Sequence, residues 1–176
     1  MKDIMNLTKK VALGVAVGFF SNFAFAQTLQ EGVANADSHK YAKAKTVFNE
    51  MIAKSPTAEN YFYLGNSYLT QFEPNFELAQ ENFNKGLAAD KKSYLNKIGL
   101  ASVKLGKGDK SAIGEIQNIV KDSRDKDPEV LYRAAEALTI FGGAANADLA
   151  IDLLNRAVEK SQKGGTPAYY YYTLGD

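Results

Sequence analysis

The chain contains no cysteine and only one histidine among its 176 residues. The absence of cysteine excludes disulfides, thiolate nucleophiles and cysteine metal sites, and it is compatible with any redox compartment. A single histidine argues against a histidine-based metal site and against an intrachain catalytic triad. Net charge is scarce as well: 21 basic residues face 20 acidic ones, so no global attraction to nucleic acid or to an anionic membrane is expected. These shortages argue against an enzyme, and we expect no cofactor and no metal.

The remaining composition is that of a folded protein. Hydrophobic residues make up 45% of the chain and charged residues 23%, which is typical of globular domains and not of disordered segments. The length is enough for one domain of ordinary size.

Residues 1–26 are expected to be a secretory signal peptide. Three lysines accompany an uncharged apolar run over residues 11–20, which is too short to span a bilayer core of roughly 30 Å. Small residues at Ala24 and Ala26 predict cleavage before Gln27. An uncleaved membrane anchor is the alternative reading. The sequence thus favours an exported protein with no membrane insertion after cleavage, located most simply in the periplasm, or else secreted or associated with an outer membrane.

A helical hairpin is the strongest pattern in the mature chain, and it spans residues 58–90. Its first half has one helical face at i, i+3, i+4 and i+7: Tyr61, Leu64, Gly65 and Tyr68. A break is expected before Pro74, because a proline disfavours helical geometry in the residue that precedes it. The second half has another apolar face: Ala79, Phe83 and Leu87.

The order of these residues resembles the signature of the tetratricopeptide repeat (TPR) family, aromatic-x-x-Leu-Gly-x-x-Tyr followed by Ala-x-x-x-Phe. The small position recurs along the chain at Gly32, Gly65, Gly99, Ala135 and Gly175. The expected units are residues 28–56, 58–91, 92–126, 128–163 and an incomplete 167–176. The resemblance, which covers nearly all of residues 27–176, implies an all-α fold, a right-handed α-solenoid of TPR-like hairpins with about four repeats and the start of a fifth.

The two ends of the array differ from its middle. The first unit has a polar first helix, as a terminal capping repeat requires. The last unit is a tyrosine-rich half-hairpin without a second helix, which favours the hypothesis that the sequence is a fragment of a longer array.

In TPR proteins the first helices of the repeats line a concave groove that holds peptides or partner helices. Carried over by position, the resemblance implies these groove residues: Phe62, Asn66, Leu69, Asn96, Leu100, Tyr132, Glu136, Tyr169 and Tyr172. Asparagine offers a peptide backbone both a donor and an acceptor, and tyrosine gives contact area at low entropic cost. The alternative is that aromatic residues at helical spacing belong to the core.

Two motifs with apparent chemistry do not fit their templates. Gly106 and Gly108 lie before a Lys-Ser pair, but the spacing is not that of a phosphate-binding loop. The acidic residues of the linker 122–127 alternate with basic ones and lack the spacing of a calcium-binding loop. Both segments are interpreted as solvated connections between helices.

The sequence therefore predicts a non-catalytic, exported TPR scaffold that binds another protein or a peptide, and not nucleic acid. Two alternatives stay open. The array could be a structural subunit of a cell-envelope complex, or the docking arm of a longer enzyme whose catalytic domain lies beyond residue 176.

Overall fold

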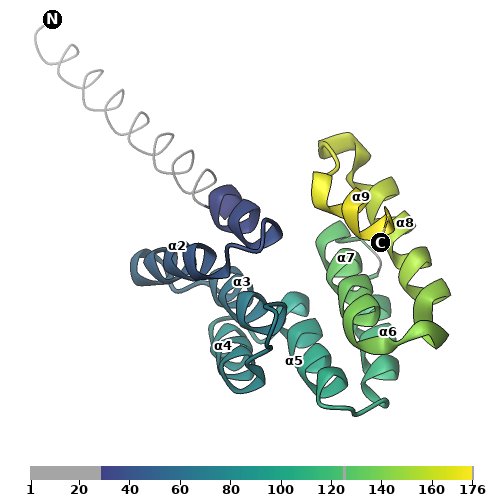
Figure 1. The fold of residues 1–176 in the computed structure, drawn as a ribbon, viewed down its shortest axis with the longest axis horizontal. Helices are drawn as coiled ribbons and strands as arrows, with labels where there is room; N and C mark the ends of the chain where they lie inside the picture. The colour runs from purple at the N-terminus through teal and green to yellow at the C-terminus, as the bar shows by residue number, and fades with distance from the viewer. Residues whose placement is uncertain (1–28, 125, 176) are drawn as a thin grey trace, which may run out of the picture.

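The computed structural model describes residues 29–124 and 126–175 (Figure 1). The expected signal peptide lies outside the described residues. Within them every regular element is helical and there is no strand. The predicted all-α helical repeat array is confirmed.

A first helix over residues 29–37 precedes eight α-helices and short helical turns in the described chain. The elements in chain order are α2 (Tyr41–Lys54), α3 (Ala58–Leu69), α4 (Phe76–Ala89), α5 (Tyr94–Gly106), α6 (Ala112–Asp122), α7 (Pro128–Ala137), the π-helical turn η1 (Leu138–Gly142), the 3₁₀ turn η2 (Ala144–Asn146), α8 (Ala147–Ser161), the 3₁₀ turn η3 (Gln162–Gly164) and α9 (Ala168–Gly175).

Side-chain caps explain where several helices begin. The side chains of Thr57, Asn75 and Ser93 each accept a hydrogen bond from a backbone N–H in the first turn of α3, α4 and α5, which satisfies a donor that the helix itself leaves free. Asp127 caps α7 in the same way, and Pro128 occupies the first helical position, where its missing N–H costs nothing. The predicted break before Pro74 is the 70–75 turn between α3 and α4.

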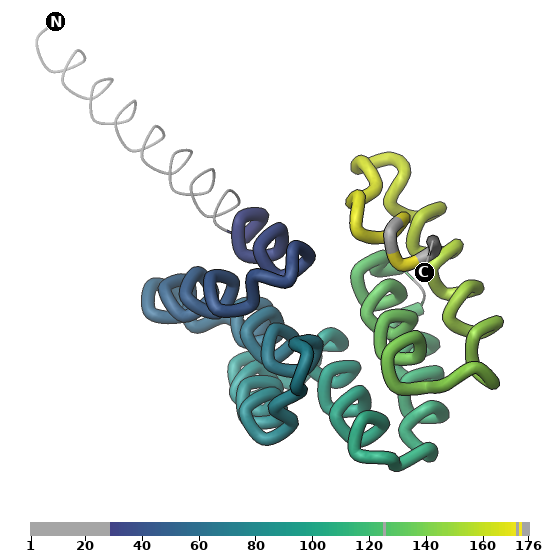
Figure 2. The backbone as a smooth tube through the Cα atoms, in the orientation of Figure 1, coloured from purple at the N-terminus to yellow at the C-terminus, as the bar shows by residue number. Residues whose placement is uncertain are grey.

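The helices pack on their sequence neighbours and form an arch (Figures 1 and 2). The first helices of successive hairpins also touch, since α3 contacts α5 and α5 contacts α7. The open side of the arch lies between the helix 29–37 and α9, the two ends of the described chain.

Glycine permits the closest helix crossings. A Cβ atom on Gly65 would lie 2.7 Å from the Phe83 ring, and one on Gly99 would lie 2.5 Å from the same ring. Gly32 meets the ring of Phe48 in the same manner. Three of the recurrent small positions are therefore places where one helix rests directly on an aromatic side chain of another.

The core consists of two clusters that share a boundary. One is centred on Phe48, Phe62 and Phe83 in α2–α4, and the other is formed by side chains of α5–α9. Leu95 and Phe141 pack against both clusters, so the hydrophobic interior is continuous along the arch.

Candidate binding groove

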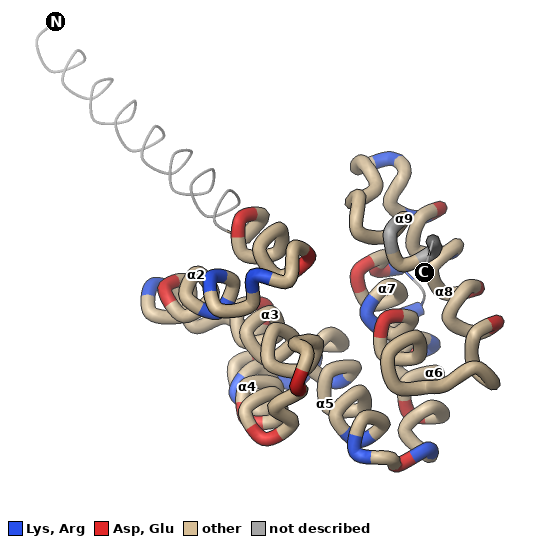
Figure 3. The backbone as a smooth tube through the Cα atoms, in the orientation of Figure 1, with Lys and Arg blue, Asp and Glu red and all other residues tan. Residues whose placement is uncertain are grey.

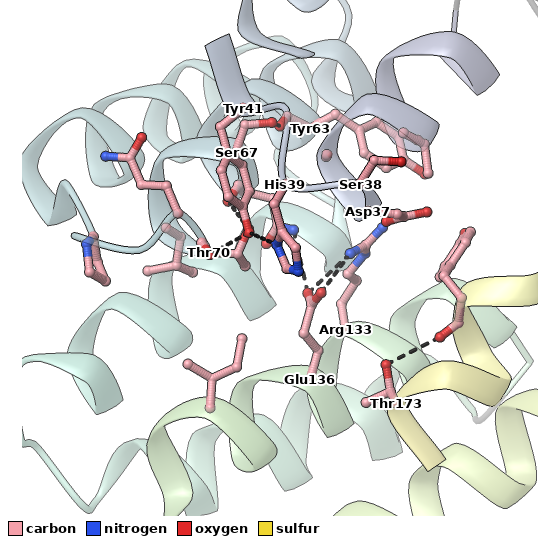
Figure 4. A pocket seen from close by; sticks show the side chains of 18 of the residues that line it. Asp37, Ser38, His39, Tyr41, Tyr63, Ser67, Thr70, Arg133, Glu136 and Thr173 are labelled. Carbon is pink, nitrogen blue, oxygen red and sulfur yellow. Dashed lines mark hydrogen bonds and ion pairs between the residues drawn. The ribbon is translucent and has the colours of Figure 1, made fainter. Parts of the chain in front are cut away.

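The concave side of the arch carries a hollow of about 820 Å³. We call it the concave groove. Its walls come from the helix 29–37 and the turn after it, α2, α3, the 70–75 turn, α7, η1 and α9. The residues that line these walls include Asp37, Asn66, Phe72, Glu136 and Tyr169. Figure 4 shows the site from close by.

A buried arginine, Arg133 of α7, occupies the floor of the groove. Its side chain is 5% exposed, and its Nε atom lies 2.8 Å from Oε1 of Glu129. Its Nη1 atom lies 3.0 Å from both carboxylate oxygens of Glu136. All three residues belong to one helix, at spacings of four and three residues that place them on one face. Although burial disfavours a charged guanidinium, Glu136 and Glu129 hold the pKa of Arg133 well above its ordinary value.

Aromatic rings surround the same guanidinium. Its Cζ atom lies 4.8 Å from the ring centre of Tyr132, 5.5 Å from that of Tyr169, 5.7 Å from Tyr63 and 5.8 Å from Phe62. These distances permit cation–π attraction. The Nε and Nη1 atoms of Arg133 are thus paired with carboxylates of its own helix.

Glu129 connects three helices through hydrogen bonds. The hydroxyl of Tyr63 in α3 donates to it at 3.3 Å, and the hydroxyls of Tyr169 and Tyr170 in α9 donate to it at 2.9 Å each. Burial, and then the nearby Glu129 charge, raise the pKa of all three phenols, so they remain neutral donors.

Asn66 links α3 to α7 at the centre of the groove. Its Nδ2 atom donates to Oε2 of Glu136 at 3.4 Å. The hydrogen bond between Tyr63 and Glu129 also joins α3 to α7. The two bonded residue pairs are 66 and 70 positions apart in the sequence. The side chains of α3 and α7 therefore meet on the concave side of α5.

The rim of the groove is acidic at one place and apolar at others. Asp37 is an exposed residue, but protein atoms around its carboxylate desolvate it and raise its pKa to about 6. Among the described residues, none forms a hydrogen bond or an ion pair with this carboxylate. Phe72 is 98% exposed and Ile140 is 48% exposed.

The turn after the helix 29–37 is fixed to the neighbouring hairpin. His39 adopts a positive φ of 57°, and its Nδ1 atom lies 3.1 Å from the hydroxyl of Tyr41. That hydroxyl donates to the backbone oxygen of Thr70 at 2.8 Å. The histidine thus belongs to a turn, and this turn forms part of the rim.

Four of the predicted residues line the concave groove: Asn66, Tyr132, Glu136 and Tyr169. Asn66, Glu136 and Tyr169 are partly exposed there, whereas Tyr132 is only 4% exposed. Leu69 also borders the groove but is only 2% exposed. The side chain of Tyr172 lies outside the described residues.

Phe62, Asn96 and Leu100 lie elsewhere, and their assignment to the groove surface needs correction. Phe62 is 1% exposed because it packs in the core beneath Arg133. Asn96 is fully buried, and its Nδ2 atom donates to the backbone oxygen of Ala58 at 2.8 Å. Leu100 lines a separate hollow of about 510 Å³ beside α4, α5 and α6. Side chains of α3 and α7 meet through hydrogen bonds, while Asn96 and Leu100 of α5 face Ala58 and the hollow beside α4 and α6 instead.

Sequence reasoning did not single out Arg133 or Asp37. A signal for Arg133 exists, since the pattern Glu-x-x-x-Arg-x-x-Glu at Glu129, Arg133 and Glu136 places opposite charges on one helical face. Asp37 carries no such signal, because only the folded arch brings it near Arg133 and Glu136.

The described residues were also searched for other kinds of site. They include no group of three or more histidine, cysteine, aspartate or glutamate side chains placed to hold a metal ion. None of the described helices combines the length and apolarity that a membrane-spanning segment needs. Figure 3 shows acidic and basic residues interspersed over the described helices, although the charged residues of α5 are both lysines, Lys97 and Lys104. No protein-family model matches the chain, and comparison with curated proteins likewise finds no significant match.

Proposed function

We propose that the chain is an exported, TPR-like scaffold that binds a segment of another protein, or a peptide, in the concave groove. The observation that carries this proposal is the groove itself, a hollow of about 820 Å³ whose walls come from both ends and from the middle of the described chain. Export and the TPR assignment are supported by the sequence patterns of residues 1–26 and of the recurrent hairpins. In this proposal the protein acts by presenting a preformed surface and performs no chemistry.

Two features of the groove suit recognition. Its floor is held rigid by the hydrogen bonds of Glu129, Arg133 and Glu136, so little conformational entropy would be lost on binding. Its rim exposes Phe72 and Ile140, and exposed aromatic and aliphatic side chains beside a pocket are typical anchors at protein interfaces.

A pair of isoleucines provides a matched test. Ile140 borders the groove and is 48% exposed, whereas Ile151 on α8 does not border it and is 49% exposed. Partners crosslinked to the full-length protein in envelope extracts would be identified by mass spectrometry, and their affinities for purified wild type, Ile140→Ser and Ile151→Ser would be compared. We expect Ile140→Ser to weaken binding at least about fivefold, or about 1 kcal/mol, and Ile151→Ser to leave it unchanged. The reverse pattern would favour an assembly subunit that uses its outer face.

A further inference from the structure

The chemistry of the groove indicates what kind of partner it accepts, and this inference rests on the proposed function. We propose that the concave groove selects an extended protein segment that carries a lysine or arginine, with this basic side chain paired to Asp37 and a neighbouring apolar side chain packed on Phe72 and Ile140.

The first argument is the charge balance of the groove. Arg133 is its buried cation, and the carboxylates of Glu129 and Glu136 already surround that cation within the protein. Two carboxylates against one guanidinium leave an excess of one negative charge, before Asp37 is counted. Asp37 adds a further carboxylate. Arg133 and His39 lower its pKa, whereas Glu136 and Glu129 raise it. A partner that complements this field must be positive.

The second argument concerns which carboxylate is available. Glu136 accepts hydrogen bonds from Arg133 and Asn66, and Glu129 accepts them from Arg133 and from three tyrosines. Asp37 alone of these acids has no such partner within the described chain. It lines the same hollow as Arg133 and Glu136, and its charge interacts with theirs. The Asp37 carboxylate is therefore the acceptor that remains free for an incoming ammonium or guanidinium group.

The third argument excludes the opposite polarity. An acidic peptide that approached Arg133 would meet a guanidinium already paired with Glu129 and Glu136, and to take the place of either carboxylate it would have to break that pair. Separating a buried ion pair leaves a charge without compensation, which is strongly unfavourable. An acidic segment would also face Asp37 directly, so like charges would repel.

The apolar part of the rim adds the second requirement. Phe72 lies in the 70–75 turn after α3, and Ile140 lies in η1 after α7. Both border the same hollow, and both expose much of their surface. A segment with a basic residue next to a leucine, valine or aromatic residue satisfies both the carboxylate and this apolar rim. A uniformly charged basic peptide satisfies only the first.

The test uses an array of immobilised random peptides probed with the purified full-length protein at low ionic strength and neutral pH. We expect the bound peptides to be enriched in lysine or arginine next to an apolar residue. For one such peptide, measured by fluorescence anisotropy, Asp37→Asn should weaken binding about tenfold, and replacing its basic residue by glutamine should have a similar effect. Asp148→Asn, which removes an exposed carboxylate of α8 outside the groove, is the matched control and should leave affinity unchanged.

The outcomes separate this inference from the proposed function. Enrichment of acidic or uncharged peptides that are lost on Ile140→Ser would overturn the inference and leave groove binding intact. Equal loss in Asp37→Asn and Asp148→Asn would show a non-specific charge effect, and this too would overturn it. Failure of every peptide to bind would contradict both proposals.

Discussion

At the scale of single residues, glycine determines how closely the helices approach. Gly65 of α3 and Gly99 of α5 lie against the same Phe83 ring, so this aromatic side chain fills the space that two missing Cβ atoms leave. The sequence pattern identified both glycines as the recurrent small position, and it did so because a tight crossing accepts so few residue types.

Gly99→Ala should therefore destabilise the protein. The new Cβ would lie 2.5 Å from the Phe83 ring, and an overpacked core typically costs about 1–3 kcal/mol. Gly114→Ala is the control, because Gly114 is a helical glycine of α6 with no atom within 4 Å of its added Cβ; that change should stabilise by up to about 1 kcal/mol. Urea denaturation followed by circular dichroism measures both. Equal stability of wild type and Gly99→Ala would contradict the crossing as described.

Other residues could not have been placed from the sequence. Phe62 and Tyr132 occupy equivalent positions in the second and fourth hairpins and both are nearly buried, yet only Tyr132 borders the groove. Arg133 of the fourth hairpin lies near both rings, and its contact with Phe62 joins residues about 70 positions apart. Repeat patterns predict which helical face is apolar, but not which apolar residues a distant repeat will cover.

At the scale of elements, the network around Arg133 holds α3, α7 and α9 together. Its guanidinium pairs with two carboxylates of α7, and one of these, Glu129, accepts hydroxyl hydrogen bonds from Tyr63 of α3 and Tyr170 of α9. Part of this arrangement could be anticipated, because the spacing of Glu129, Arg133 and Glu136 is visible in the sequence. The contribution of α3 and α9 depends on the curvature of the array, which the periodicity of one hairpin does not specify.

Replacing Arg133 by methionine tests this network. The change keeps an unbranched apolar chain but leaves Glu129 and Glu136 without their cation, and breaking a buried pair costs about 3–5 kcal/mol. Lys85→Met is the control, since Lys85 forms an exposed ion pair with Glu81 at 2.6 Å and such pairs contribute about 1 kcal/mol or less. At neutral pH, Arg133→Met should therefore lower the free energy of unfolding by more than Lys85→Met does. A loss in Arg133→Met no larger than that in Lys85→Met would show that the network contributes little to stability.

At the scale of the whole molecule, the arch gathers like charges that are far apart in sequence. The helix 29–37 and α7 border the same groove, so the charge of Asp37 interacts with those of Glu136 and Glu129, and also with those of Arg133 and His39. Desolvation and these two carboxylates raise the pKa of Asp37 from its ordinary value to about 6, against the opposing effect of Arg133. Within the proposal made above, this carboxylate is the group that a basic side chain of the partner would pair with.

The pH dependence of stability follows from this raised pKa. Between about pH 4 and pH 6 the folded state holds the Asp37 proton more tightly than the unfolded state, so its contribution to stability falls as pH rises through this window. Asp37→Asn removes that dependence. The variant should therefore match wild type near pH 4 and exceed its stability at pH 7, whereas Asp148→Asn should show the same offset from wild type at both values. Thermal or urea unfolding at the two pH values measures the difference. If Asp37→Asn is less stable than wild type at pH 7, the carboxylate already has a favourable partner in the folded protein, and the groove does not await a cation.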